Sequence, residues 1–227
     1  MARTTNHAAH AVRRDTFVDV ATGLIMQKGY DGMSIQDVLD ATGASRGAFY
    51  HYFRGKDELL NAVIDKLVDD AWPMLEGIVT DASRPATDKF ANLFSGLASF
   101  KAERRDLVLA ILRVWLSPEN AVLRERWRAV SGERLMQLLC AIFEQGRAEG
   151  TFQIGDPEAD ARVIAALMLG ANNEATQLFL ARQDGSVTTD EVYIRLSAYS
   201  RAVERLLGLP PNSTPLASRE LIDTWYA

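Results

Sequence analysis

The feature that most constrains the fold of this 227-residue chain is the segment from Ser34 to Lys56, which predicts two short helices joined by a tight turn. Ser34 is a favourable N-cap, and Asp37 stands three residues later, where it can approximate a capping box and favour the positive end of the helix. Gly43 follows this helix, and a glycine suits the left-handed conformation that ends a helix before a sharp change of direction. Ser45 can then cap the second helix. The segment therefore predicts a helix-turn-helix.

The two predicted helices have faces of opposite character. Apolar residues at helical spacing predict a buried face on each helix: Ile35, Val38 and Leu39 on the first, Phe49 and Phe53 on the second. The outward face of the second helix offers hydrogen-bond donors and no carboxylate, through Arg46, Gly47, Tyr50 and His51. A guanidinium can bind a guanine edge or a phosphate, and hydroxyl groups bond phosphate oxygens. Such a surface suits a polyanion, and a helix-turn-helix is a device that places one helix in the major groove of DNA.

An ordered series of residues extends this pattern on both sides. It comprises an opening helix with Phe17, Val20, Ala21, Leu24 and Ile25, then Lys28-Gly29-Tyr30, Ser34-Ile35, Ala41-Thr42-Gly43, Ser45-Arg46-Gly47, Phe49-Tyr50, Phe53 and Lys56-Asp57-Glu58-Leu59. With this series, the segment from Arg14 to Leu59 resembles the DNA-binding domain of the TetR (tetracycline-repressor-like) family of bacterial transcriptional regulators. The departures are small: Val38-Leu39 stands where the family usually has Ile-Ala, Ala44 where Val is common, and Tyr52 where His is common. They leave the fold in place and affect only fine contacts.

The resemblance implies DNA-binding roles for individual residues. Phosphate contacts would come from Ser34, Ser45, Tyr50, Tyr52 and Lys56. Base reading would fall to Arg46, to His51, and to Ala48 through apolar contact with a thymine methyl group, while Gly47 lets the backbone approach DNA closely. The alternative for Arg46 and Lys56 is a solvated surface charge.

The charge distribution qualifies the expectation of a nucleic-acid partner. The chain has a net charge of -5, which a generic basic DNA binder would not show. Residues 1–66 nevertheless hold eight basic and eight acidic side chains, so the negative excess lies entirely beyond them. Within the first fourteen residues, Arg3, Arg13 and Arg14 stand without any acid. This segment is expected to be a flexible arm that reaches phosphates or the minor groove, or else a frayed terminus.

Composition and motifs favour a soluble protein without catalytic machinery. Hydrophobic residues make up 48% and charged residues 24%, an ordinary globular profile. No run of about 18 apolar residues and no secretory signal is found, so we expect a cytoplasmic protein with no membrane partner. The three histidines, His7, His10 and His51, lack metal-ligand spacing, and no nucleophile elbow or phosphate-cradling glycine loop occurs. We therefore expect no enzyme, cofactor or metal. The single Cys140 is expected to pack as a small hydrophobe, with redox sensing as the alternative.

Helical patterns continue beyond Leu59 with no convincing strand. The predicted helices span 57–80, 87–103, 105–116, 118–150, 157–182 and 189–207. The first of these is expected to bend near Pro73. The helix that restarts at Pro118 and runs to Gly150 could break near Gly132. The predicted architecture is all-α, with an N-terminal three-helix DNA-binding head continuing into a larger helical ligand-binding and dimerisation body. The expected domains are an arm and head over 1–56, the body over 57–208, and a tail over 209–227 that either docks or stays mobile.

The last two long helices suggest an assembly. An apolar seam on the final helix and apolar or small residues on the preceding helix predict close helix packing, through Val192, Leu196, Tyr199, Val203 and Leu206, and through Val163, Leu167, Gly170, Ala171 and Leu178. These residues can pack within one chain. The TetR resemblance implies instead a homodimer with a four-helix interface, whose two recognition helices, about 34 Å apart, fit successive major grooves of a near-palindromic operator.

The body is where a small effector would bind. Aromatic residues there, and a polar run within an otherwise apolar helix, make up the predicted pocket: Trp72, Phe94, Phe100, Trp115, Asn173 and Gln177. The aromatic residues could equally fill a core, and solvent or the dimer interface could satisfy the amides. The resulting hypothesis is a repressor of double-stranded operator DNA that a small, largely apolar effector releases. The alternatives are an activator or nonspecific DNA binder with the same head, or an enzyme or ligand-binding protein with an incidental helix-turn-helix.

Overall fold

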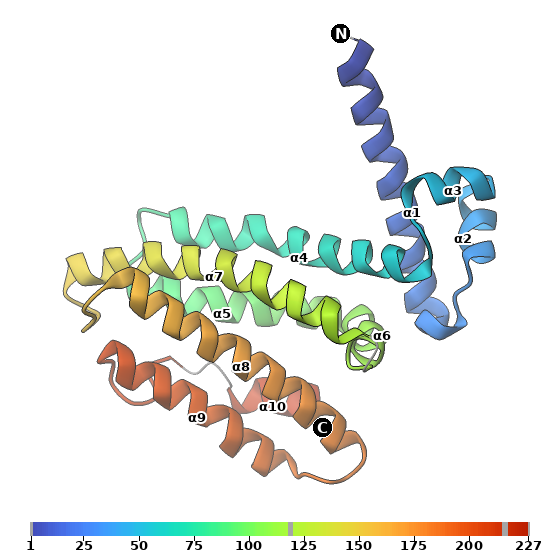
Figure 1. Ribbon diagram of the computed structural model, residues 1–227. Coiled ribbons are helices and arrows are strands. Elements are labelled where there is room, and N and C mark those ends of the chain that lie inside the picture. The colour runs from blue at the N-terminus through green and yellow to red at the C-terminus, as the bar shows by residue number, and fades with distance from the viewer. Residues whose placement is uncertain (1, 118–119, 215–217, 227) are drawn as a thin grey trace. The chain divides into compact units, whose positions relative to one another are not determined.

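A computed structural model describes residues 2–117, 120–214 and 218–226, and these residues form ten α-helices and no strand (Figure 1). The helices are α1 (Ala2–Gly32), α2 (Ile35–Thr42), α3 (Arg46–Tyr52), α4 (Lys56–Thr80), α5 (Ala86–Glu103), α6 (Arg105–Trp115), α7 (Ala121–Glu149), α8 (Pro157–Gln183), α9 (Thr189–Leu207) and α10 (Arg219–Tyr226). The predicted all-α class is confirmed. No helix in the described ranges is both long enough and apolar enough to cross a membrane.

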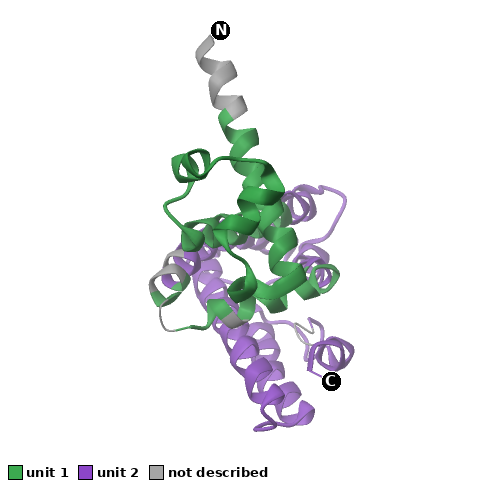
Figure 2. Ribbon diagram, turned by 90° about the vertical axis from the view of Figure 1, so that its right-hand side faces the viewer, with its two compact units in different colours: residues 1–72, 101–124 green, residues 73–100, 125–227 purple. Residues whose placement is uncertain are grey.

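The chain divides into two compact units, the first made of residues 1–72 and 101–124 and the second of residues 73–100 and 125–227 (Figure 2). The sequence predicted a boundary at residue 56 instead. The structural division differs because α4 begins in the first unit and because α6 packs on α1. This packing joins helices that are more than seventy positions apart in the chain, which local patterning does not reveal.

The core of the first unit is built around Phe17 of α1. Its ring is fully buried and meets the ring of Phe49 edge to face at 5.7 Å and the ring of Phe53 at 6.1 Å. Leu59 and Leu60 at the start of α4 are buried as well. Aromatic pairs in this geometry add to the free energy gained by apolar burial. The core therefore fixes α3 against α1.

The N-terminal segment is helical from Ala2 onward, whereas the sequence predicted either a flexible arm or a frayed terminus. The first 22 residues contain no glycine or proline and include four alanines in the first eleven, a composition that favours helix. Any contact of this segment with DNA would therefore come from a helix.

Two long helices run through residues that could have interrupted them. Pro73 lies inside α4, which continues to Thr80. Gly132 lies inside α7, so the predicted break there does not occur. Its neighbour across the α7–α8 packing is Leu169, whose terminal methyl group would lie 2.9 Å from a Cβ at this position. Pro118, where the sequence predicted a helix restart, lies outside the described residues.

The second unit contains an aromatic cluster where α5 packs on α7. The Phe143 ring lies 6.0 Å from that of Phe90 and 5.6 Å from that of Phe152. Beside the cluster, the buried Lys89 ammonium donates to Gln145 Oε1 at 2.7 Å. The Glu149 carboxylate accepts from the Ala86 N–H at 3.0 Å, a bond that lowers the pKa of Glu149. The carboxylate thereby satisfies a free donor at the start of α5.

The C-terminal tail docks within the second unit, which settles the alternative that the sequence left open. Helices α8 and α9 pack together, and α10 contacts both. The buried carboxylate of Glu204 accepts from the N–H groups of Asn212 and Thr214 at 3.0 and 3.1 Å. In α10, Ile222 and Tyr226 are buried, and the Tyr226 hydroxyl donates to Ala175 O at 2.8 Å.

Gly146 allows a close approach that no other residue would permit. A Cβ at this position would lie 2.1 Å from a ring carbon of the buried Phe152. We expect Gly146→Ala to lower the free energy of unfolding by about 1 to 3 kcal/mol, because the ring must shift inside a packed core. Urea unfolding followed by circular dichroism measures this change.

Gly77 provides a matched control, since it lies in α4 with open space around its Cα. Gly77→Ala should leave stability unchanged or raise it by about 0.5 to 1 kcal/mol through helix propensity alone. Equal effects of the two substitutions would contradict the steric argument.

Candidate nucleic-acid interface

The turn between α2 and α3 has the geometry that the sequence predicted. Ser34 Oγ accepts from Asp37 N at 3.2 Å, and Asp37 Oδ2 accepts from Ser34 N at 2.7 Å, which completes the capping box. Gly43 ends α2 in the left-handed conformation at φ 62° and ψ 24°. The Ala44 N–H then donates to Leu39 O at 3.2 Å. These bonds fix the change of direction that presents α3.

The two faces of α3 are as predicted. Ser45 Oγ accepts from Ala48 N at 3.2 Å and caps the helix. Phe49 and Phe53 are buried at 0% and 1% exposure, so the opposite face must point outward. That outward face carries four exposed residues: Arg46, Gly47, Tyr50 and His51. Since no carboxylate occurs from Gly43 to Lys56, nothing within this stretch opposes a polyanion.

The two serines predicted to contact phosphates differ in their surroundings. The Ser34 hydroxyl donates to Asp37 Oδ2 at 2.7 Å, and that carboxylate also pairs with Lys28 Nζ at 2.7 Å. Both contacts, Lys28 first, hold the pKa of Asp37 well below its usual range, so a negative charge stays beside Ser34. Ser45 Oγ has no such carboxylate partner among the described residues. Ser45 is therefore better placed than Ser34 to donate to a phosphate.

Lys56 is held at the junction of α1 and α4. Its Nζ lies 4.1 Å from the centroid of the Tyr30 ring and 3.5 Å from Asp31 O. The Tyr30 hydroxyl in turn donates to Asp57 Oδ1 at 2.5 Å, and burial together with Asp57 raises the pKa of Tyr30. These contacts orient the ammonium of a half-exposed side chain, which is what a positioned phosphate contact requires.

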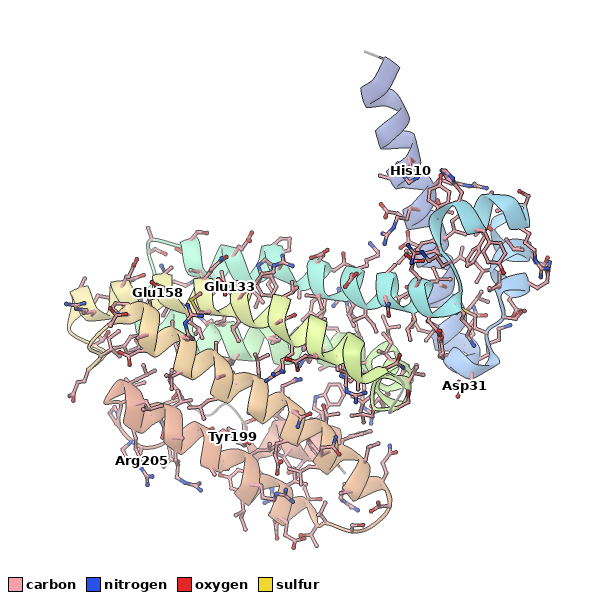
Figure 3. The ribbon with its side chains drawn as sticks, in the orientation of Figure 1. His10, Asp31, Glu133, Glu158, Tyr199 and Arg205 are labelled. Carbon is pink, nitrogen blue, oxygen red and sulfur yellow. The ribbon has the colours of Figure 1, made fainter. Side chains whose placement is uncertain are left out.

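His10 of α1 lies beside the end of α3, which sequence reasoning missed (Figure 3). Its ring centroid is 5.4 Å from that of His51 and 4.5 Å from that of Tyr52. Tyr52 is half-buried between His10 and Phe17. The two histidines are 41 residues apart, so no local spacing could have paired them. The predicted site residues thus gain a neighbour on α1.

Comparison with known proteins agrees with this geometry. Residues 17–63 match the model of the family described as bacterial regulatory proteins, tetR family. They cover the second half of α1, the whole of α2 and α3, and the start of α4. Residues 17–63 therefore carry the match to the TetR family. Its curated relatives include the HTH-type transcriptional repressor KstR2 of Rhodococcus jostii (strain RHA1), 25% identical over 190 residues, which are 79% of this chain and 85% of the relative. The repressor NemR of Escherichia coli (strain K12) is 28% identical over 175 residues, 74% of this chain and 86% of the relative.

Solved structures of the TetR family share the fold over most of both chains. A TetR/AcrR-family regulator from Thermobifida fusca YX-ER1 is 25% identical, with a TM-score of 0.58 over 84% of this chain and 96% of that structure. A TetR regulator from Haloarcula marismortui is 22% identical, with a TM-score of 0.60 over 87% and 97% of the two chains. The chain is therefore a DNA-binding transcriptional regulator in class, and its head is the part that carries the family match.

The ten residues predicted for a dimer interface divide into two groups in the structure. Four are buried within the second unit and so pack inside their own chain, the alternative left open by the sequence: Leu178, Val192, Leu196 and Val203. The other six keep exposed or partly exposed side chains or backbone: Val163, Leu167, Gly170, Ala171, Tyr199 and Leu206. Gly170 is in van der Waals reach of Tyr199, so part of this second group also mediates the contact between α8 and α9.

The six residues predicted for an effector pocket lie in both units. Trp72 and Trp115 belong to the first unit and are half-buried. Phe100 is buried, and the half-buried Phe94 packs on Phe90 with ring centroids 5.1 Å apart. The other two, Asn173 and Gln177, are exposed on α8, so neither amide needs a partner within the chain. The pocket remains a prediction.

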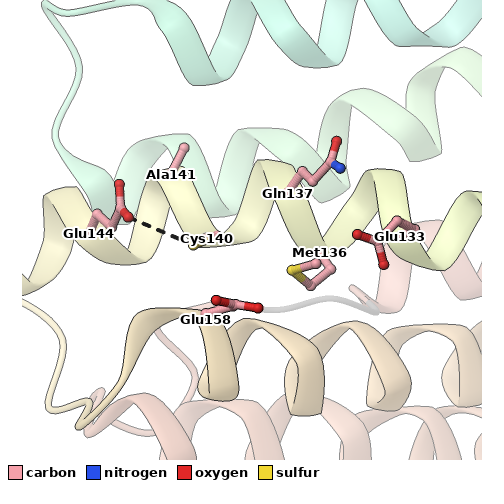
Figure 4. A pocket seen from close by; sticks show the side chains of 7 residues that line it. All are labelled: Glu133, Met136, Gln137, Cys140, Ala141, Glu144 and Glu158. Carbon is pink, nitrogen blue, oxygen red and sulfur yellow. Dashed lines mark hydrogen bonds between the residues drawn. The ribbon is translucent and has the colours of Figure 1, made fainter.

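One open groove of about 340 Å³ lies between α7 and α8 in the second unit (Figure 4). It is lined by none of the six predicted residues but by Glu133, Met136, Gln137, Cys140, Ala141, Glu144 and Glu158. Burial, and then the charges of Glu144 and Glu158, raise the pKa of the Cys140 thiol. The thiol therefore stays protonated and is a poor nucleophile.

Proposed function

We propose that this protein is a homodimeric, cytoplasmic repressor that binds a near-palindromic operator and is released from it by a small effector. The observation that carries the proposal is the outward face of α3, where Arg46, Tyr50 and His51 are exposed beside Ser45 and no carboxylate intervenes. A helix with this face can enter a major groove, with Arg46 bonding a guanine edge and the hydroxyls bonding phosphates. The names of KstR2 and NemR as repressors support repression as the output.

The dimer is proposed because a single head would read too few base pairs for a specific site. A two-fold pair of heads reads two half-sites about 34 Å apart. Support comes from exposed apolar side chains on α8 and α9, namely Val163, Ile194 and Leu206, which are 50%, 62% and 46% exposed. Large apolar side chains in water contribute no burial free energy to a monomer, whereas a self-complementary interface between two copies would bury them.

Release by an effector is proposed from the continuity of α4, which passes from the first unit into the second. A ligand bound by the body would act on the heads only if it prefers a conformation in which they do not fit the operator. A compound that raises the melting temperature of the protein should therefore weaken operator binding. A stabilising compound that leaves operator affinity unchanged would argue against release.

Selection of bound fragments from genomic DNA with purified protein tests the proposal as a whole. We expect a near-palindromic motif that binds far more tightly than random DNA at two salt concentrations, with the specific complex the more resistant to salt. Random-sequence duplex of equal length is the control. Weak, strongly salt-dependent binding without sequence preference would reduce the head to a nonspecific anchor. A site whose position activates its promoter would favour the activator alternative.

A further inference from the structure

Two imidazoles from different helices meet at the DNA-facing end of the head. The rings of His10 and His51 are 5.4 Å apart in an edge-to-face arrangement, and both side chains are exposed. Tyr52 contacts both rings, at 4.5 Å from His10 and 5.2 Å from His51, and is itself half-buried against Phe17. The half-buried Tyr52 ring therefore contacts both exposed imidazole rings and holds them in position.

The charged groups around this pair are mostly cationic. On α1, Arg13 and Arg14 follow His10 by three and four residues, the spacing of neighbours on one helix face. Their guanidinium groups lie over the rings of Phe17 and Phe53 at 5.7 and 5.4 Å. On the α3 side, Arg54 follows His51 by three residues and is exposed.

Two carboxylates, Glu58 and Asp15, lie on the elements next to the pair. Glu58 at the start of α4 accepts from the Arg54 N–H at 2.6 Å and so turns toward the α3–α4 junction. Asp15 on α1 is five residues from His10, a spacing that puts the two side chains on different sides of a helix. Among the described residues, neither imidazole is hydrogen-bonded or ion-paired to a carboxylate, and arginines lie at neighbouring positions on both helices.

We propose that His10 and His51 together form a phosphate site whose occupation by DNA is coupled to proton uptake. The inference rests on the proposed function, since it requires α3 to lie in the groove of an operator. A backbone phosphate against the pair brings a negative charge beside both rings, and it favours the doubly donating imidazolium form. His10 thereby extends the DNA contact from α3 to α1, and His51 serves the backbone instead of a base edge.

The sign of the pH dependence follows from linkage. Binding that takes up protons is strengthened by acid, and the gain is confined to the interval in which an imidazole titrates, centred near 6.5 in model peptides. If an imidazole binds its proton tenfold more tightly in the DNA complex than in the free protein, protonation can strengthen DNA binding by at most tenfold for each proton. We expect the full chain to bind its selected operator about three- to tenfold more tightly at pH 6 than at pH 8.

The test compares this affinity ratio in the wild-type protein and in variants, by fluorescence anisotropy at constant ionic strength with the selected operator. His10→Gln and His51→Gln keep polar side chains that do not titrate, so each should reduce the ratio and the double variant should bring it below twofold. Arg13→Gln is the matched control: it removes an exposed charge of the same helix, so affinity should fall at both pH values while the ratio stays above threefold.

Three outcomes overturn the inference. One is a wild-type ratio near one, and another is a double variant that keeps the wild-type ratio. The third is a ratio that survives in His10→Gln but not in His51→Gln, which would leave α1 without a part in the site. Tight, sequence-specific binding without pH dependence sinks only the phosphate site, whereas absence of specific binding at both pH values sinks the proposed function as well.

Discussion

Replacement of Arg46 by Ala is expected to weaken binding to the cognate operator about 5- to 150-fold, the range that corresponds to a loss of about 1 to 3 kcal/mol. Arg46 is exposed at the first position of α3, directly after the Ser45 cap, which is where a side chain would reach a base edge if α3 enters a major groove as proposed. A guanidinium there can donate two parallel bonds to the O6 and N7 atoms of guanine, which no neighbouring residue on this face can replace. Anisotropy titrations with operator and random duplex measure the effect.

The comparison between the two DNA sequences assigns the role of Arg46. A base contact predicts a large loss on operator and a small one on random DNA, whereas equal losses would make Arg46 a phosphate contact. Arg46→Lys sharpens this distinction, because lysine keeps the charge and lacks the planar fork. Arg84→Ala is the control for net charge, since Arg84 pairs with Asp81 at 2.7 Å in the second unit and should leave DNA affinity unchanged.

The parts of the head that the sequence predicted are those with a local cause. The caps at Ser34 and Ser45, the left-handed Gly43 and the inward Phe49 each depend on residues within four positions, so spacing alone is enough to place them. The same holds for the long helices, whose bounds follow from periodicity and from end signals. The N-terminal segment shows the limit: charge favoured an arm there, but helix propensity decided its conformation.

Features that depend on distant contacts could not be predicted in this way. The pairing of His10 with His51 and the packing of α6 on α1 join segments far apart in the chain, and neither leaves a local pattern. The seam on α9 illustrates the converse problem, because apolar residues at helical spacing look the same whether they face their own chain or a partner. Burial within the second unit accounts for Val192 and Val203.

Phe49→Ala should lower the free energy of unfolding by about 3 to 5 kcal/mol, the largest single effect that we expect in the head. Phe49 is fully buried and its ring meets those of Phe17 at 5.7 Å and Phe53 at 5.7 Å, so truncation opens a cavity between α1 and α3. Loss of these ring contacts adds to the loss of burial. Urea unfolding monitored by circular dichroism measures the change, and Phe49→Leu, which keeps most of the volume, should cost much less.

The consequence for DNA binding separates stability from recognition. Arg46→Ala should lose affinity at an unchanged melting temperature, because its side chain is exposed. Phe49→Ala should lose affinity because α3 is no longer held against α1, and saturating operator should restore part of its melting temperature, since DNA binds only the folded head. If Phe49→Ala kept its wild-type stability and still failed to bind, the ring would have to contact DNA itself, which its complete burial against Phe17 contradicts.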